Sequence, residues 1–174
     1  FFSAIQLFPF IELFHHSIRG GGISYQEATT WSFAPKDFLL FFLPDAYGYF
    51  LDMKKYWVTQ CWLKTLYTGG LPFILSLFFF IFGKGRKLFF SLMVFSLFLS
   101  LGHYNPLFPF VFKYVPFFNG IRYPVKFLYI FILALSITAG LGFHRLTEGL
   151  KESEQKRYKN LFFILSLLFG VFLF

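Results

Sequence analysis

Two polar segments of this 174-residue chain carry side chains that could bind an anion. In the first segment Arg19 stands beside the glycines at positions 20–22, just after an apolar run. The second segment holds Arg122, Tyr123 and Lys126. A guanidinium group matches two phosphate oxygens at once, and glycine lets backbone N–H groups approach an anion. Both segments therefore predict phosphate binding. The alternative is an arginine that extends from a membrane interface towards lipid headgroups.

Proline at position 124 restricts the backbone of the second segment. Pro124 fixes its own φ, disfavours helical geometry at Tyr123 and suits the first position of a helix. We therefore expect Tyr123 to be extended and a helix to begin at Pro124. Arg122 and Lys126 would then lie beside a helix N-terminus, whose unpaired N–H groups also favour an anion.

Other polar residues of the two segments could help to hold a ligand. These supporting candidates are Glu12, Ser17, His103, Asn105 and Tyr123. Glu12 lies at the edge of an apolar run, where a charged side chain is costly. No pair of carboxylates has a spacing that indicates general acid–base chemistry, so the sequence assigns no catalytic residue.

The sequence shows no metal site, although a divalent metal could still serve as a cofactor. His15 and His16 are adjacent, so on a helix their side chains point about 100° apart, which is poor geometry for one metal ion. A single cysteine, Cys61, can form neither an internal disulfide nor a cysteine cluster. The glycine- and lysine-rich stretch 83–87 lacks the spacing of a phosphate-binding P-loop.

The composition is typical of a membrane protein. The chain is 57% hydrophobic and 14% charged, against about 25% charged residues in soluble domains. Apolar runs predict transmembrane helices at 1–14, 65–82, 88–101, 125–143 and 161–174. The predicted fold class is therefore an all-α, polytopic transmembrane helical bundle that forms one membrane region. Because the chain begins and ends inside apolar runs, we expect a piece of a longer protein, truncated at both ends.

Basic residues predict the orientation in the membrane. The net charge is +8, and lysine and arginine are densest in the segments 83–87 and 144–160. The positive-inside rule places these two segments in the cytoplasm. The loops 15–64 and 102–124, which carry the anion-binding candidates, would then face outward. Within loop 15–64, residues 37–43 are apolar but too few to span, which predicts an interfacial or re-entrant piece. Since the rule accounts for the charge, nucleic acid is not expected as a partner.

Two segments of the chain resemble YfhO-like bacterial membrane proteins. The first, residues 4–48, matches their pattern at Gln6, Pro9, Glu12, Leu13, Ser17, Arg19, Gly20, Glu27, Ala28, Pro35, Pro44 and Gly48. The second, residues 102–146, matches at Gly102, Pro106, Pro116, Phe117, Arg122, Pro124, Lys126, Phe127, Ala139, Gly140 and Gly142. Lys126 stands where arginine is more common in these proteins. The two segments cover about half of the chain.

The resemblance implies a multi-pass glycosyltransferase of GT-C type in the bacterial cytoplasmic (inner) membrane. Such an enzyme would transfer a sugar from a polyprenyl-phosphate donor to an extracytoplasmic cell-envelope acceptor, in contact with membrane lipid. It implies that Arg19, Arg122 and Lys126 bind the donor phosphate, and that the catalytic carboxylate lies upstream of residue 1. Two alternatives are a transporter or flippase of lipid-linked sugars, and a non-catalytic membrane scaffold.

Overall fold

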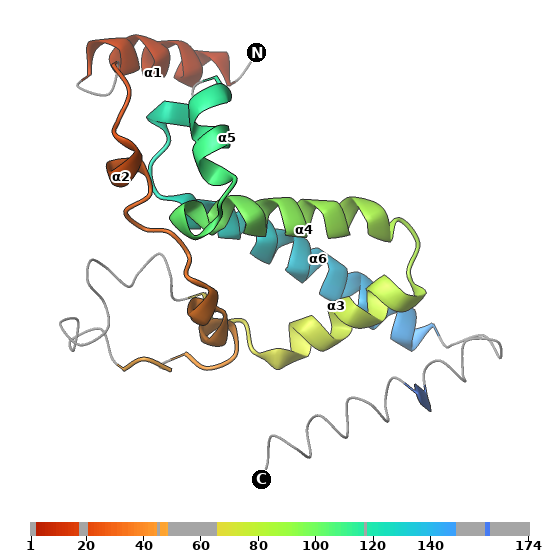
Figure 1. Cartoon of the computed structure of the whole chain (residues 1–174). Coiled ribbons are helices and arrows are strands. Elements are labelled where there is room, and N and C mark those ends of the chain that lie inside the picture. The colour runs from red at the N-terminus through yellow and green to blue at the C-terminus, as the bar shows by residue number, and fades with distance from the viewer. Residues whose placement is uncertain are drawn as a thin grey trace. The chain divides into compact units, whose positions relative to one another are not determined.

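The computed structural model describes residues 3–17, 21–44, 46–48, 66–116, 118–148 and 159–160. The regular elements of this part, shown in Figure 1, are α1 (Ala4–His16), α2 (Tyr25–Ala28), the 3-10 helix η1 (Pro35–Phe41), α3 (Gly70–Phe82), α4 (Arg86–Ser100), η3 (Gly102–Tyr104), α5 (Phe108–Tyr114), η4 (Phe118–Gly120), η5 (Pro124–Phe127) and α6 (Leu128–Thr147). No strand occurs in the described ranges. The predicted all-α class is therefore confirmed for this part of the chain.

One helix of the described part is long and apolar enough to cross a membrane. The combined helix Pro124–Thr147 has 24 residues and a mean hydropathy of 1.9, and it covers the predicted span 125–143. Helices α3 and α4 lie on the predicted spans 65–82 and 88–101, but they have 13 and 15 residues, fewer than the about 20 that a bilayer requires. The predicted span 161–174 lies outside the described residues. A bundle of several spans therefore stays a prediction.

The start of α3 differs from the sequence-based expectation. Hydropathy placed it at residue 65, whereas the helix begins at Gly70. Just before it, the N–H groups of Thr68 and Gly69 both donate to the carbonyl oxygen of Phe41, at 3.1 and 2.9 Å. Gly69 has a φ of +73°, a left-handed conformation that interrupts a right-handed helix. These backbone contacts therefore set the beginning of α3 later than the apolar run does.

The chain divides into two compact units. The first comprises Phe1–Gly69 and Leu92–Ile132, and the second comprises Gly70–Ser91 and Leu133–Phe174. The core of the first unit includes Phe33, Leu40 and Phe41, and the ring centroids of Phe41 and Phe131 lie 5.5 Å apart. The segment 37–43, predicted to be interfacial, thus forms most of η1 and buries Leu40 and Phe41, while Leu39, Phe42 and Leu43 are exposed.

Within the second unit α3 packs closely on the C-terminal part of α6. The buried hydroxyl groups of Ser76 and Thr138 form a 2.7 Å hydrogen bond between the two helices. A few residues further on, Gly142 lies against the backbone of Leu75. In Figure 1 the two helices run in the same direction, so their C-terminal ends lie on the same side of this unit. Such an arrangement is the one expected if segments 83–87 and 144–160 share a membrane side.

Thr138→Val should lower the free energy of unfolding by about 1 kcal/mol, because Ser76 loses its interhelical partner. The matched control is Thr147→Val. Thr147 is exposed on the same helix, and its hydroxyl bonds only to the carbonyl oxygen of His144 among the contacts described. Unfolding in bicelles by titration with SDS measures both effects. Equal changes in the two variants would mean that the Ser76–Thr138 bond adds nothing to helix packing.

Candidate functional site

The two polar segments singled out in the sequence lie against each other in the first unit. Three backbone hydrogen bonds join them, from the N–H of Ile23 to Asn119 (3.0 Å), of Tyr123 to Ala28 (3.0 Å) and of Val125 to Trp31 (3.2 Å). We call the paired stretches 23–31 and 119–126 the loop junction. Because a bond occurs every few residues along both stretches, their relative register is fixed by the backbone itself.

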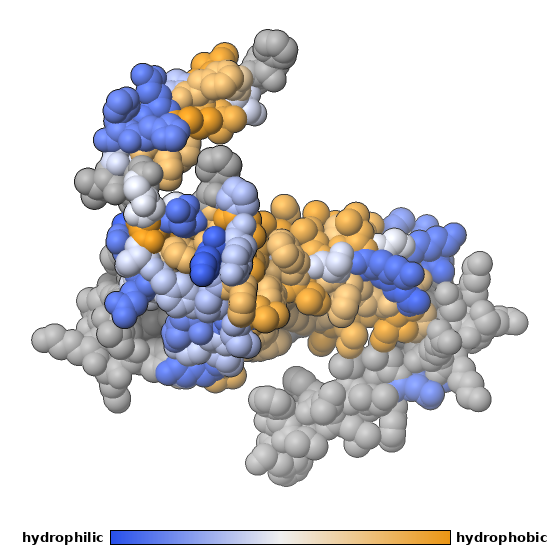
Figure 2. Space-filling model, turned by 45° about the horizontal axis from the view of Figure 1, so that its top comes forward, coloured by the Kyte–Doolittle hydropathy of each residue, from blue (hydrophilic) through white to orange (hydrophobic). Residues whose placement is uncertain are grey.

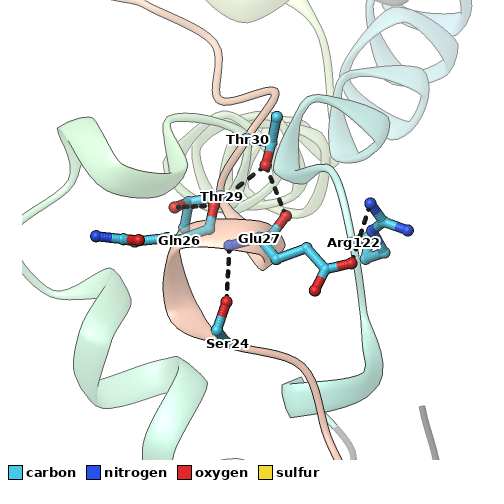
Figure 3. A network of polar contacts seen from close by, with 6 residues as sticks. All are labelled: Ser24, Gln26, Glu27, Thr29, Thr30 and Arg122. Carbon is cyan, nitrogen blue, oxygen red and sulfur yellow. Dashed lines mark hydrogen bonds and ion pairs between the residues drawn. The ribbon is translucent and has the colours of Figure 1, made fainter. Parts of the chain in front are cut away.

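The short helix α2 shapes one side of the loop junction. Ser24 caps it, since its hydroxyl oxygen accepts the N–H of Glu27 at 3.2 Å. At the other end the hydroxyl of Thr29 donates to the carbonyl oxygen of Tyr25 at 2.8 Å, and that of Thr30 donates to Glu27 at 2.9 Å. The bonds of Ser24 and Thr30 to the backbone of Glu27, drawn in Figure 3, hold that backbone while the Glu27 side chain points towards Arg122.

Arg122 and Glu27 form an ion pair across the loop junction. Nη2 of Arg122 lies 3.1 Å from Oε1 of Glu27, and the two side chains are 24% and 45% exposed. An exposed pair of this kind contributes at most about 1 kcal/mol to stability, because water screens both charges. The neighbouring Nε on the same guanidinium is buried without a hydrogen-bond partner among the described residues. Nε1 of Trp31 is also buried and lacks such a partner.

Tyr123 differs from its predicted conformation. It has φ 67° and ψ 79°, which is left-handed rather than extended, and it is the one described non-glycine residue with positive φ. Such a backbone costs about 1–2 kcal/mol. Two contacts stabilise it, namely the hydrogen bond of its N–H to Ala28 and the stacking of its ring on Trp31, with centroids 3.7 Å apart. The predicted helix start is confirmed, as Pro124 is the first residue of η5.

The ring of Tyr123 gathers two positive charges. Cζ of Arg122 lies 4.8 Å and Nζ of Lys126 lies 5.0 Å from its centroid, both within the range of a cation–π contact. Lys126 is exposed. Counting the formal charges of Arg122, Lys126 and Glu27 gives a net charge of +1 for this group, so the loop junction can attract an anion.

The remaining predicted site residues have other surroundings. Arg19 lies outside the described residues. Glu12 is exposed on α1. Ser17 ends α1, and its hydroxyl donates to the carbonyl oxygen of Phe14 at 2.8 Å. The backbone N–H of His103 donates to Oγ of Ser32 at 3.0 Å.

Asn105 is a buried residue that shapes the end of α4. Its Nδ2 donates to the carbonyl oxygen of Phe98 at 2.9 Å, and its Oδ1 accepts the N–H of Leu107 at 3.0 Å. The amide therefore ties the last turn of α4 to the loop that follows. Both polar groups of the Asn105 amide therefore form hydrogen bonds within the fold, although the sequence suggested them as contacts for a ligand.

Glu27 and Trp31 belong to the site although the sequence singled out neither as a site residue. Glu27 is one of the positions that carry the family resemblance, and Trp31 is not among them. The sequence around Glu27 and around Trp31 does not indicate a contact with Arg122 or Tyr123. The signal is the backbone pairing of the two segments, which becomes visible only in three dimensions.

A mixed polar and apolar cleft also opens in the first unit. Its volume is about 770 Å³, and its walls come from residues 21–23 and Tyr25, from helix α5, and from residues 115–116 and Asn119. The rings of Tyr25 and Phe112 meet edge to face there, 5.5 Å apart. Burial raises the pKa of the Tyr25 hydroxyl above its ordinary value of 10.0, so this group stays a protonated hydrogen-bond donor at neutral pH.

In the described ranges no group of three or more histidine, cysteine, aspartate or glutamate side chains could hold a metal ion. Comparison of the chain with protein-family models, curated proteins and solved structures gives no match. The chemistry of the loop junction itself is therefore the basis for inferring a function.

Proposed function

We propose that the loop junction binds the phosphate of a polyprenyl-phosphate sugar donor at the outer face of the bacterial cytoplasmic membrane. The chain would be part of a polytopic glycosyltransferase of GT-C type that transfers the sugar to a cell-envelope acceptor. One observation carries the proposal: Arg122 and Lys126 both lie over the ring of Tyr123, immediately before and within the first turn of the membrane-length helix. The resemblance to YfhO-like proteins supports the same reading.

The position of the two cations favours a lipid-linked phosphate. A phosphate at headgroup depth lies where a transmembrane helix leaves the hydrocarbon, which is the level of Pro124 if Pro124–Thr147 crosses the bilayer. Beyond this level α6 exposes apolar side chains, including Tyr129 and Ile130, and hydrophobic residues cover the visible side of α4 in Figure 2. A ligand with a charged head and a long apolar chain fits such a surface.

Arg122 and Lys126 would stabilise the leaving group of the transfer. When the bond between sugar and phosphate breaks, negative charge grows on the phosphate oxygens. Cations that are already in place lower the energy of this state more than that of the bound donor. The proposal assigns donor binding to these residues and assigns the base that activates the acceptor hydroxyl to none of the described residues.

Arg122→Gln is expected to weaken binding of a lipid phosphate at least about tenfold, because charge-assisted hydrogen bonds contribute about 1.5–3 kcal/mol. The probe is farnesyl phosphate, titrated by calorimetry into the chain reconstituted in nanodiscs. Arg145→Gln is the matched control, since Arg145 lies near the other end of α6 and pairs with Glu148 at 3.7 Å. Unchanged affinity in Arg122→Gln would remove the basis of the proposed site.

Transfer itself gives a second readout. In bacterial membranes that contain the whole protein, Arg122→Gln should abolish sugar transfer from a radiolabelled polyprenyl-phosphate donor at an equal level of inserted protein. The control Arg145→Gln should retain transfer. If Arg122→Gln binds farnesyl phosphate poorly but transfers at the normal rate, the site binds a lipid phosphate that is not the donor.

A further inference from the structure

We propose that Glu27 sets the charge of the loop junction and thereby selects a monoanionic phosphodiester over a diphosphate. This inference rests on the proposed function, because it assumes that Arg122 and Lys126 bind a lipid phosphate. The donor already proposed is a sugar joined to polyprenol through one phosphate, and its single charge matches the site that Glu27 leaves. Glu27 is thus a specificity-determining residue, and no covalent step is assigned to it.

The geometry makes the Glu27 carboxylate an internal substitute for a ligand. Oε1 of Glu27 lies 3.1 Å from Nη2 of Arg122, the distance and position that a phosphate oxygen would take. The side chain is 45% exposed, and Figure 3 shows it reaching from α2 across to Arg122. An arriving phosphate can therefore replace the carboxylate from the solvent side.

The exchange requires only a side-chain rotation at Glu27. Its backbone N–H is held by Ser24, and the adjacent stretch is held to the second segment by the bond between Tyr123 and Ala28. The guanidinium is positioned independently of the pair, since it also lies over the ring of Tyr123, which stacks on Trp31. Displaced from Arg122, the carboxylate stays tethered near the bound anion, which it repels.

The formal charges of the site explain why this repulsion disfavours a diphosphate more than a phosphodiester. Arg122 and Lys126 together carry +2, and Glu27 lowers the sum to +1. A phosphodiester carries −1 and neutralises the site, whereas a diphosphate brings a larger charge that meets the nearby carboxylate and costs more desolvation. Replacing Glu27 by glutamine removes the repulsion, so the affinity gain grows with the charge of the ligand.

The test compares three ligands that share one apolar tail and differ in headgroup charge. They are farnesyl methyl phosphate, farnesyl phosphate and farnesyl diphosphate, titrated into the wild-type chain and into Glu27→Gln in neutral nanodiscs. The wild type should bind the methyl phosphate at least as tightly as the diphosphate. In Glu27→Gln we expect about threefold tighter binding of the methyl phosphate and about thirtyfold tighter binding of the diphosphate, because each further negative charge on the ligand multiplies the gain by about three.

The sign of the change separates this inference from a purely structural role of the ion pair. If Glu27 only holds the two segments together, Glu27→Gln weakens all three ligands alike and lowers the unfolding temperature, and the inference is overturned. Glu148→Gln is the matched control, because it removes a carboxylate that pairs with Arg145 at the far end of α6. It should leave all affinities unchanged.

Failure of the inference is distinguishable from failure of the proposed function. If Arg122→Gln weakens all three ligands while Glu27→Gln does not shift their order, the phosphate site stands and Glu27 has no part in its selectivity. If Arg122→Gln and Lys126→Gln leave every affinity unchanged, the proposed function itself fails.

Discussion

Gly142→Ala is expected to lower the free energy of unfolding by about 3 kcal/mol, near the upper end of overpacking costs. A Cβ at Gly142 would overlap the carbonyl oxygen of Leu75 and would lie 3.3 Å from the backbone nitrogen of Phe79. Both obstacles are backbone atoms of α3, so no side chain can rotate away. The two helices must separate, and the hydrogen bond between Ser76 and Thr138 would lengthen as they do.

Gly140→Ala provides the matched control for this prediction. Gly140 lies in the same helix, and a Cβ there would meet nothing within 4 Å. Alanine should raise stability at this position by about 0.5–1 kcal/mol, because glycine is the poorer helix former. Unfolding by SDS in bicelles measures the two variants side by side. Effects of the same sign would show that α3 and α6 do not pack as closely as described.

Gly102→Ala is expected to destabilise the first unit by about 3 kcal/mol, the sum of a left-handed backbone and a steric overlap. Gly102 is buried with φ +50°. A Cβ would overlap Oγ of Ser32 and lie 2.8 Å from Cγ of Pro124. Because Pro124 follows Tyr123 directly, the displacement should also disturb the two cations over the Tyr123 ring and weaken farnesyl phosphate binding.

Gly48→Ala is the control that separates the cost of the left-handed backbone from the cost of the steric overlap. Gly48 also has a positive φ, +88°, but a Cβ there would meet nothing within 4 Å. The variant Gly48→Ala should therefore lose only about 1–2 kcal/mol of unfolding free energy, the cost of the backbone conformation, and should keep its phosphate affinity. Thermal unfolding and calorimetric binding on the same samples provide both readouts. Similar losses of affinity in Gly48→Ala and Gly102→Ala would mean that the contact with Pro124 does not position the site.

The helices were predictable where apolar runs and prolines dictate them. The run 125–143 and Pro124 predict a membrane-length helix, and the structure contains one from Pro124 to Thr147. Hydropathy did not reveal the short helix α5 (Phe108–Tyr114) inside the predicted loop 102–124, nor the start of α3 at Gly70. Helix α5 follows a turn in which the N–H of Phe108 donates to the carbonyl oxygen of Asn105, whereas the start of α3 depends on backbone contacts with the distant Phe41.

Part of the candidate site was predictable for the same reason. Arg122, Tyr123 and Lys126 are neighbours in sequence, so their grouping before a proline-initiated helix needs no tertiary contact. The conformation of Tyr123 was predicted incorrectly. The rule for residues before proline describes local sterics, whereas the hydrogen bond to Ala28 and the stack on Trp31 stabilise a left-handed backbone that the local rule does not favour.

Composition, hydropathy and the positions of prolines are properties of short stretches, and they suffice for the helical class, the apolar helix after Pro124 and the cations at its start. The partner of Arg122 is not such a property. Glu27 reaches Arg122 only because three backbone hydrogen bonds align two segments that are far apart in the chain. The energy of that alignment depends on both segments at once, so neither one predicts the ion pair on which the charge of the site depends.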